Sequence, residues 1–232
     1  MTKEILKQAS DDLIKLFSRA LKGKELKITF NWGVSEKTVS EIGGRLIEDF
    51  ILASLPTELE IELEPFSGTF INCNIPKSQR AMEDIGFTWL APDGNTSIEL
   101  LIDVKGHNET KTGSRPNLAS IRKCKEFYSR PENEELWIFY CRYTPTVEKE
   151  STDTNISYKI EDGSFTDKGM FLLKSLSDRN MDPANIGSGG QILFARENNI
   201  TLIDRDRKGM LDFLDSLSDH LGKLKEAKKK KK

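Results

Sequence analysis

The sequence predicts a single α/β (or α+β) domain with a mixed sheet of five or six strands, flanked by helices. Segments with helical periodicity alternate along the chain with segments of strand periodicity, and a tight Pro-Asp-Gly turn requires at least one antiparallel hairpin. The length of 232 residues suits one domain with a full core. We expect this domain to span residues 1–227, followed by a disordered lysine tail at residues 228–232.

The N-terminal part predicts two helices and two strands. Residues 3–22 have apolar residues at helical spacing and are followed by Gly23, and residues 26–30 read as a short strand. Thr38 and Glu41 have the spacing of a capping box for a helix over about 39–54. Residues 58–64 alternate Glu with apolar residues, a pattern typical of a half-exposed strand.

The centre of the chain predicts a hairpin. Residues 84–91 and 97–105 read as strands, and the turn chemistry of residues 92–95 joins them. The apolar run at residues 100–102 indicates that the second strand is buried. A helix over 117–129 and a very apolar strand over 136–143 follow.

The C-terminal part predicts a polar linker, two helices and two strands. The expected ranges are a linker at 144–154, strands at 156–160 and 192–195, and helices at 166–180 and 207–226.

Asp103 and Lys105 are the strongest candidates for chemistry. Alternate residues of a strand point the same way, so both side chains lie on one face at the end of a buried strand. The hairpin can bring Asp84 beside them. Two carboxylates and a lysine around one point form the composition of a magnesium site for phosphodiester cleavage. The alternative is an ordinary salt bridge at a strand end.

Composition limits the other function classes. The net charge of −2 neither favours nor excludes a nucleic-acid partner, because a site-specific enzyme needs only local basic surface. Three cysteines without metal-ligand spacing indicate reduced thiols and a cytoplasmic protein. The chain has only two histidines and no apolar run of membrane-spanning length, which argues against a histidine-based zinc site and a membrane partner.

Asp84 and the run Asp103-Val104-Lys105 resemble the motif of the PD-(D/E)xK nucleases. Within that superfamily the chain is similar to the blunt-cutting type II restriction endonucleases of the EcoRV and HincII kind. Glu83 replaces the proline of the motif, and Gln79 ends a Pro-Lys-Ser-Gln run similar to one ahead of the first Asp in such enzymes. Downstream, residues 185–188 resemble the end of their base-reading loop.

The resemblance implies a Mg²⁺-dependent hydrolase of a restriction system. It implies a homodimer, formed through the N-terminal helical elements, that cuts double-stranded DNA at a short palindrome to leave 5′-phosphate, blunt ends. Asp84, Asp103 and the backbone carbonyl of Val104 would bind the metal, with Glu48 as a candidate helper from the helix. Lys105 would orient the attacking water and stabilise the transition state. For Glu48 the alternative is a solvated helix glutamate.

Two further segments are candidates for contacts with DNA. The polar loop after Lys105 and the Gly-rich segment before the strand at 192–195 both have side chains suited to phosphates or base edges. Without the resemblance, they read as an ordinary loop and a turn. The expected DNA-binding residues are Gln79, His107, Asn108, Lys111, Ser114, Arg115, Asn117, Ala184, Asn185, Ser188 and Gln191.

Two other functions remain open at this point. A structure-specific or repair nuclease would share the metal site but recognise no fixed sequence. A non-catalytic DNA-binding protein would use Asp103 and Lys105 as a salt bridge only.

Overall fold

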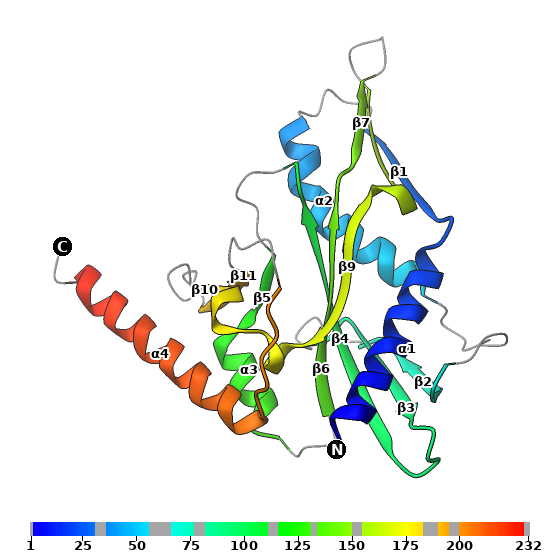
Figure 1. Cartoon of the computed structure of the whole chain (residues 1–232). Helices are drawn as coiled ribbons and strands as arrows, with labels where there is room; N and C mark the ends of the chain where they lie inside the picture. The colour runs from blue at the N-terminus through cyan, green and yellow to red at the C-terminus, as the bar shows by residue number, and fades with distance from the viewer. Residues whose placement is uncertain are drawn as a thin grey trace.

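The chain folds around a five-stranded mixed sheet in the computed structural model (Figure 1), which describes residues 2–30, 36–55, 66–76, 82–110, 116–130, 134–149, 155–182, 190–194 and 200–229. The strand order is β2-β3-β4-β6-β9. Within these described parts, β4 and β6 run parallel and the other neighbouring pairs run antiparallel. The strands are β2 (Thr69–Asn74), β3 (Ile85–Leu90), β4 (Ser97–Asn108), β6 (Glu134–Tyr143) and β9 (Phe165–Leu172).

Two smaller antiparallel sheets complete the described strands. The first has the order β1-β8-β7 and contains β1 (Glu25–Phe30), β8 (Ile156–Glu161) and β7 (Thr146–Lys149). The second has the order β10-β11-β5 and contains β10 (Met181–Asp182), β11 (Gln191–Phe194) and β5 (Asn117–Ser120). The predicted mixture of helices with a mixed sheet is therefore confirmed.

Helices cover both faces of the central sheet. One face packs against α1 (Lys3–Leu21) and α2 (Glu36–Ser54), and the other against α3 (Ile121–Tyr128) and α4 (Arg207–Lys229). Figure 1 shows α3 and α4 on one side of β4 and β6, and α1 on the other. Each strand contributes to both layers because its side chains alternate.

The strand β6 illustrates this alternation. Trp137, Phe139 and Cys141 join the core under α1 and α2, whereas Leu136 and Ile138 join the core under α3 and α4. All of them are buried, and such a strand reads in the sequence as a continuous apolar run.

Buried Asp12 fixes α1 to the edge of the sheet. Its carboxylate accepts hydrogen bonds from the Ser67 amide at 2.9 Å, the Gly68 amide at 2.9 Å and the Trp89 indole Nε1 at 3.1 Å. A buried carboxylate is tolerated when donors satisfy its oxygens in this way. The helix itself starts at Thr2, whose hydroxyl accepts from the Ile5 amide.

Close contact between α2 and β4 requires a glycine at position 106. A Cβ built there would lie 2.3 Å from Ile47 Cγ2, which is far inside van der Waals contact. This approach brings α2 against the strand one residue after Lys105.

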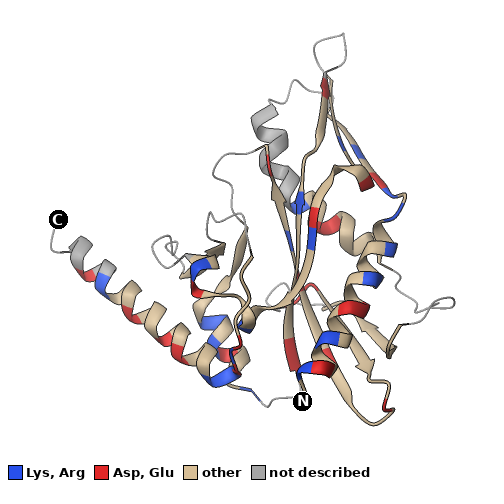
Figure 2. Ribbon diagram, in the orientation of Figure 1, with Lys and Arg blue, Asp and Glu red and all other residues tan. Residues whose placement is uncertain are grey.

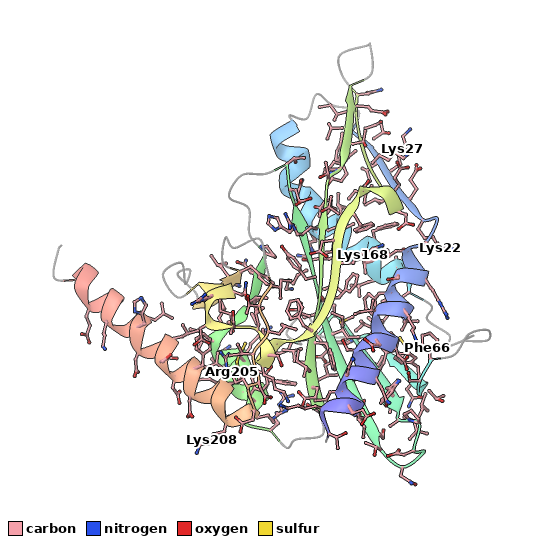
Figure 3. The ribbon with its side chains drawn as sticks, in the orientation of Figure 1. Lys22, Lys27, Phe66, Lys168, Arg205 and Lys208 are labelled. Carbon is pink, nitrogen blue, oxygen red and sulfur yellow. The ribbon has the colours of Figure 1, made fainter. Side chains whose placement is uncertain are left out.

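Residues around Arg205 attach α4 to the layer beneath it. The Arg205 guanidinium pairs with Asp178 and lies 4.7 Å from the centre of the Phe213 ring (Figure 3). Arg207, at the first turn of α4, donates to the carbonyls of Glu134 and Phe127 at 2.8 and 2.9 Å. Basic and acidic side chains are interspersed along α4 (Figure 2), and the helix continues past its predicted end through Lys229.

The predicted helix over 166–180 is wrong. Its first half is the strand β9, which pairs with β6, and two short 3₁₀ turns at Leu173–Ser175 and Asp178–Asn180 follow. Met170 and Leu172 enter one core, whereas Phe171 and Leu173 enter the other. A strand buried on both faces shows consecutive apolar residues, which periodicity alone cannot distinguish from a helix.

Smaller differences occur elsewhere. The predicted helix over 117–129 is a short strand, β5, followed by α3, and the predicted linker over 144–154 contains β7. Because α2 begins at Glu36, Thr38 lies inside the helix rather than at its N-cap. The strand predicted over 58–64 lies outside the described residues. No helix in the described part of the chain is both long and apolar enough to cross a membrane.

Candidate active site

The strand β4 carries an ionic pair on the face that packs toward α3 and α4. Ile102 and Val104 point into the opposite core, so Asp103 and Lys105 lie on the same face of β4 as Leu101. Asp103 is 4% exposed, and the Lys105 side chain is 14% exposed. The Lys105 ammonium donates a hydrogen bond to Asp103 Oδ1.

Backbone hydrogen bonds hold Asp84 beside this pair. The Asp84 amide donates to the Ile102 carbonyl at 2.8 Å, and its carboxylate Oδ2 accepts from the Val104 amide at 2.8 Å. The amide and carbonyl of one residue in an antiparallel ladder point to the same edge of the strand. The Val104 carbonyl therefore faces the same edge as Asp84.

Glu48 reaches the same end of β4 from α2. The Gly106 backbone hydrogen-bonds to the Glu48 carboxylate. The close contact between Ile47 and Gly106 places the neighbouring Glu48 beside this part of β4. Burial raises the pKa of Glu48 above its ordinary value of 4.5; the positive charge of Lys105 opposes this rise, and the negative charge of Asp84 adds to it.

Burial and neighbouring charges together shift the pKa values of both members of the pair. Burial raises the pKa of Asp103 well above 3.8, with Lys105 opposing the rise and Asp84 adding to it. Burial alone would lower the pKa of Lys105, but the Asp103 carboxylate, helped by Glu48 and Asp84, raises it above 10.5. One ammonium is thus surrounded by three carboxyl groups, an arrangement that a further cation would stabilise.

The donor set suits Mg²⁺. Asp84, Asp103 and the Val104 carbonyl supply hard oxygen atoms, and Mg²⁺ is commonly held by one or two carboxylates while it keeps several waters. Within the described residues, no three His, Cys, Asp or Glu side chains form a ready-made metal cluster. In this structure the Lys105 ammonium is the cation that binds Asp103.

A cavity of about 260 Å³ opens directly on these groups. One wall consists of Asp84, Asp103 and Lys105, with Met82 beside them. The other wall comes from β5, the start of α3 and the start of β11, and its residues are Asn117, Leu118, Ala119, Ser120, Lys123 and Gln191. We call these two groups of lining residues, which come from different parts of the fold, the first wall and the second wall.

Four of the residues predicted to bind DNA lie in the described part of the chain. Asn117 and Gln191 line the cavity. His107 lies two residues beyond Lys105, and its Nδ1 is 2.7 Å from the Tyr140 hydroxyl. Asn108 is buried, and its Oδ1 accepts from the Thr110 amide and hydroxyl at 3.0 and 2.7 Å, which assigns it to a turn.

The remaining predicted DNA contacts lie outside the described residues. They are Gln79, Lys111, Ser114, Arg115, Ala184, Asn185 and Ser188. The recognition-loop interpretation of residues 185–188 stays a prediction.

Sequence reasoning missed Ser120 and Lys123. Both were assigned to the interior of one helix over 117–129, where nothing distinguishes a functional lysine from a solvated one. The signal that could have found them is Ser120 as an N-cap, because its hydroxyl accepts from the Lys123 amide at 3.2 Å and places Lys123 on the first turn.

Two comparisons with known proteins found no relative of this chain. No model of a known protein family matches the chain, and no curated protein sequence matches it either.

Proposed function

We propose that this protein is a Mg²⁺-dependent endonuclease that hydrolyses phosphodiester bonds in double-stranded DNA. The supporting observation is that Asp84, Asp103 and Lys105 lie together in the lining of one cavity, with the Asp103 carboxylate paired to Lys105 and the Asp84 carboxylate bound to the Val104 amide. Glu48 and the Val104 carbonyl lie at the same strand end.

The roles of the residues follow from their chemistry. Asp84, Asp103 and the Val104 carbonyl would hold Mg²⁺, which when bound acidifies a coordinated water and neutralises charge on the scissile phosphate. Lys105 orients the attacking water and donates to the phosphate oxygen on which negative charge grows. The Glu48 carboxylate, held by the Gly106 backbone, helps to keep the Lys105 ammonium charged at this position.

The reaction is an in-line displacement at phosphorus. The water oxygen forms a new bond to phosphorus, the bond from phosphorus to the 3′ oxygen breaks, and the 3′ oxygen takes a proton. The products are a 5′-phosphate and a 3′-hydroxyl.

The narrower proposal is a type II restriction endonuclease with a restriction-endonuclease-like core. Its support is the resemblance of Asp84, Asp103-Val104-Lys105 and residues 185–188 to that family. A homodimer suits this activity, because a two-fold protein matches a palindromic site and each active site cuts one strand. Asn117 and Gln191 at the cavity are the described residues best placed to contact the DNA.

One observation favours a different reading. The Lys105 ammonium already pairs with Asp103, as it would in a purely structural salt bridge of a DNA-binding protein. A nuclease without sequence preference would share the proposed metal site. The following experiment separates these three functions.

The test is digestion of a large phage genome with Mg²⁺, beside a Ca²⁺ control, with sequencing of the ends. Discrete fragments sharing one palindrome would support the restriction enzyme and reveal its site and stagger. A continuous smear that depends on Mg²⁺ would support the non-specific nuclease, and the absence of cutting with Mg²⁺ or Mn²⁺ would refute both nucleases.

Variants assign any cleavage to this site. Asp84→Asn and Lys105→Ala should each reduce the rate by about 10²- to 10³-fold or more. The matched control is Lys174→Ala, because Lys174 forms a similarly buried ion pair with Glu135 and does not line the cavity. Equal loss in Lys174→Ala would show that the effect comes from disrupted folding.

A further inference from the structure

The second wall of the cavity differs in charge from the first. Both carboxylates that line the cavity, Asp84 and Asp103, belong to the first wall, and the charged residue of the second wall is Lys123. The cavity lining thus contains two lysines, Lys105 of the proposed metal site and Lys123 of α3.

The second wall is firmly anchored. Ser120 pairs with Gln191 in the β5–β11 ladder, and the Ile121 amide donates to the Gly190 carbonyl at 2.8 Å. Below this surface, Cys124 and Phe127 of α3 are fully buried in the core. Lys123 therefore extends from a fixed backbone, because the Ser120 hydroxyl binds its amide.

Neighbouring cations of α3 point elsewhere. Arg122 is largely exposed and lies 3.7 Å from Glu126, and Lys125 lies 2.6 Å from Asp215 of α4. Neither residue lines the cavity, whereas Lys123 does. Arg122, which is next to Lys123 in the sequence and does not line the cavity, therefore serves as the control residue.

The volume of the cavity exceeds what a single water-sized group needs. At about 30 Å³ for each water, 260 Å³ admits a phosphate group together with part of an attached sugar. A DNA strand has a phosphate at every nucleotide, so a second cation beside the metal site can contact a phosphate adjoining the reacting one.

We propose that Lys123 binds a phosphate of the cleaved strand next to the scissile phosphate, so that the strand is held between the two walls. This inference rests on the proposed nuclease function and adds a substrate-binding subsite to it. Lysine acts here as a point charge, so the contact positions the strand without reading its sequence.

The test is equilibrium binding of a fluorescein-labelled duplex in Ca²⁺, over a range of NaCl concentrations. The duplex is a fragment of the digested genome, and the proteins are the wild type, Lys123→Ala, Lys123→Arg and Arg122→Ala. Lys123→Ala should weaken binding about tenfold and reduce the slope of log K against log salt by about one. Lys123→Arg should restore most of the affinity and most of the salt dependence. Arg122→Ala should match the wild type in both measurements.

Cleavage kinetics give a second readout. A duplex with an uncharged methylphosphonate next to the cut should reduce wild-type cleavage, yet it should cause little further loss in Lys123→Ala. Additive losses would show that Lys123 contacts another group and would overturn the proposal, as would wild-type binding and salt dependence in Lys123→Ala.

Failure of the subsite can be told apart from failure of the nuclease. If the wild type cuts DNA and Lys123→Ala behaves like it, only the subsite is refuted. If the wild type neither cuts nor binds DNA, both proposals fail. If Lys123→Ala melts at a lower temperature, Lys123→Gln, which retains the length and polarity of the side chain, replaces it in each measurement.

Discussion

The two faces of the central sheet differ in the residues that β4 presents to them. On the face under α1 and α2, the β4 row of Ile98, Leu100, Ile102 and Val104 is apolar up to Gly106. On the opposite face the β4 row is Ser97, Glu99, Leu101, Asp103, Lys105 and His107, so Leu101 is the one apolar residue of that row. The layers above both faces are apolar, so the difference arises in the strand itself.

The difference shows that, in a strand between two layers of helices, the face that carries buried polar residues is the better candidate for a functional site. Apolar residues on one face supply the packing that holds the strand, and polar residues on the other face are retained at a cost in desolvation. The raised pKa of Asp103 reflects that cost. We call the face under α1 and α2 the first face and the face under α3 and α4 the second face. Variants that make the second face resemble the first, or that weaken the first face, test whether the first face stabilises the fold and the second face serves function.

The largest effects should come from substitutions in the Asp103–Lys105 pair of the second face. In EDTA, Asp103→Leu combined with Lys105→Met should leave the free energy of unfolding unchanged or raise it by about 1–4 kcal/mol, while cleavage is abolished. Lys105→Met alone should lower that free energy by about 3–5 kcal/mol, because Asp103 then remains buried without its partner. Urea denaturation measures both, and a double variant as unstable as the single one would mean that the pair holds the fold.

The next effect should come from the first face. Phe139 packs against Phe17 with ring centres 4.4 Å apart and is fully buried, so Phe139→Ala should lower the free energy of unfolding by about 3–5 kcal/mol. Cleavage per folded molecule should persist. Leu202→Ala, at a half-exposed leucine, should change that free energy by less than about 0.5 kcal/mol. A similar loss of unfolding free energy in Phe139→Ala and Leu202→Ala would contradict the assignment of Phe139 to the core.

A smaller loss should follow from Asp12→Ala. This change leaves the amides of Ser67 and Gly68 and the Trp89 indole without their acceptor and should cost about 2–3 kcal/mol. Lys15→Ala is the control, since its ammonium lies 3.8 Å from Asp12 and is half-exposed, and it should cost less than about 1 kcal/mol. A larger effect of Lys15→Ala would mean that the ion pair, rather than the three donors, stabilises Asp12.

The smallest effect should appear in the pH dependence of stability. The pKa of Asp103 is raised on folding, so the folded state holds a proton that the unfolded chain loses near its ordinary pKa of 3.8. This contribution is fully present below that value and is lost as the pH rises through the raised pKa. Denaturation of the wild type in EDTA should therefore lose more stability between acidic and neutral pH than Asp103→Asn, and parallel profiles would refute the assignment.

The sequence was informative wherever one pattern had one structural solution. Residues 97–105 alternate, contain an apolar run and follow a Pro-Asp-Gly turn, so the strand, the hairpin and the shared face of Asp103 and Lys105 were all predictable. The helix predicted over residues 3–22 was equally clear, because the spacing of its apolar residues fits a helix alone and Gly23 follows it.

Other parts were not predictable for physical reasons. The apolar run of β9 resembles a helix in the sequence, because its consecutive residues are buried in two different cores. Only the structure shows that one helical layer covers each face of the strand. The second wall of the cavity also depends on tertiary pairing, since β5 pairs with β11 from a distant part of the chain. Lys123 becomes a candidate only once that pairing brings it into the lining of the same cavity as Lys105.

The parallel pairing of β4 with β6 has a consequence for the order of folding. Parallel neighbours cannot be joined by a tight turn, so the chain must leave the sheet and return, and β5 and α3 lie on that crossover. All residues that line the cavity except Gln191 lie between Met82 and Lys123. Loop closure is cheaper over this short stretch than for the pairing of β1 with β8, whose residues 25–30 and 156–161 are far apart in the chain. We therefore expect amide protection in hydrogen exchange to develop first in β3, β4 and β6, and later in the β5–β11 and β1–β8 pairings, whose partners are far apart in the chain.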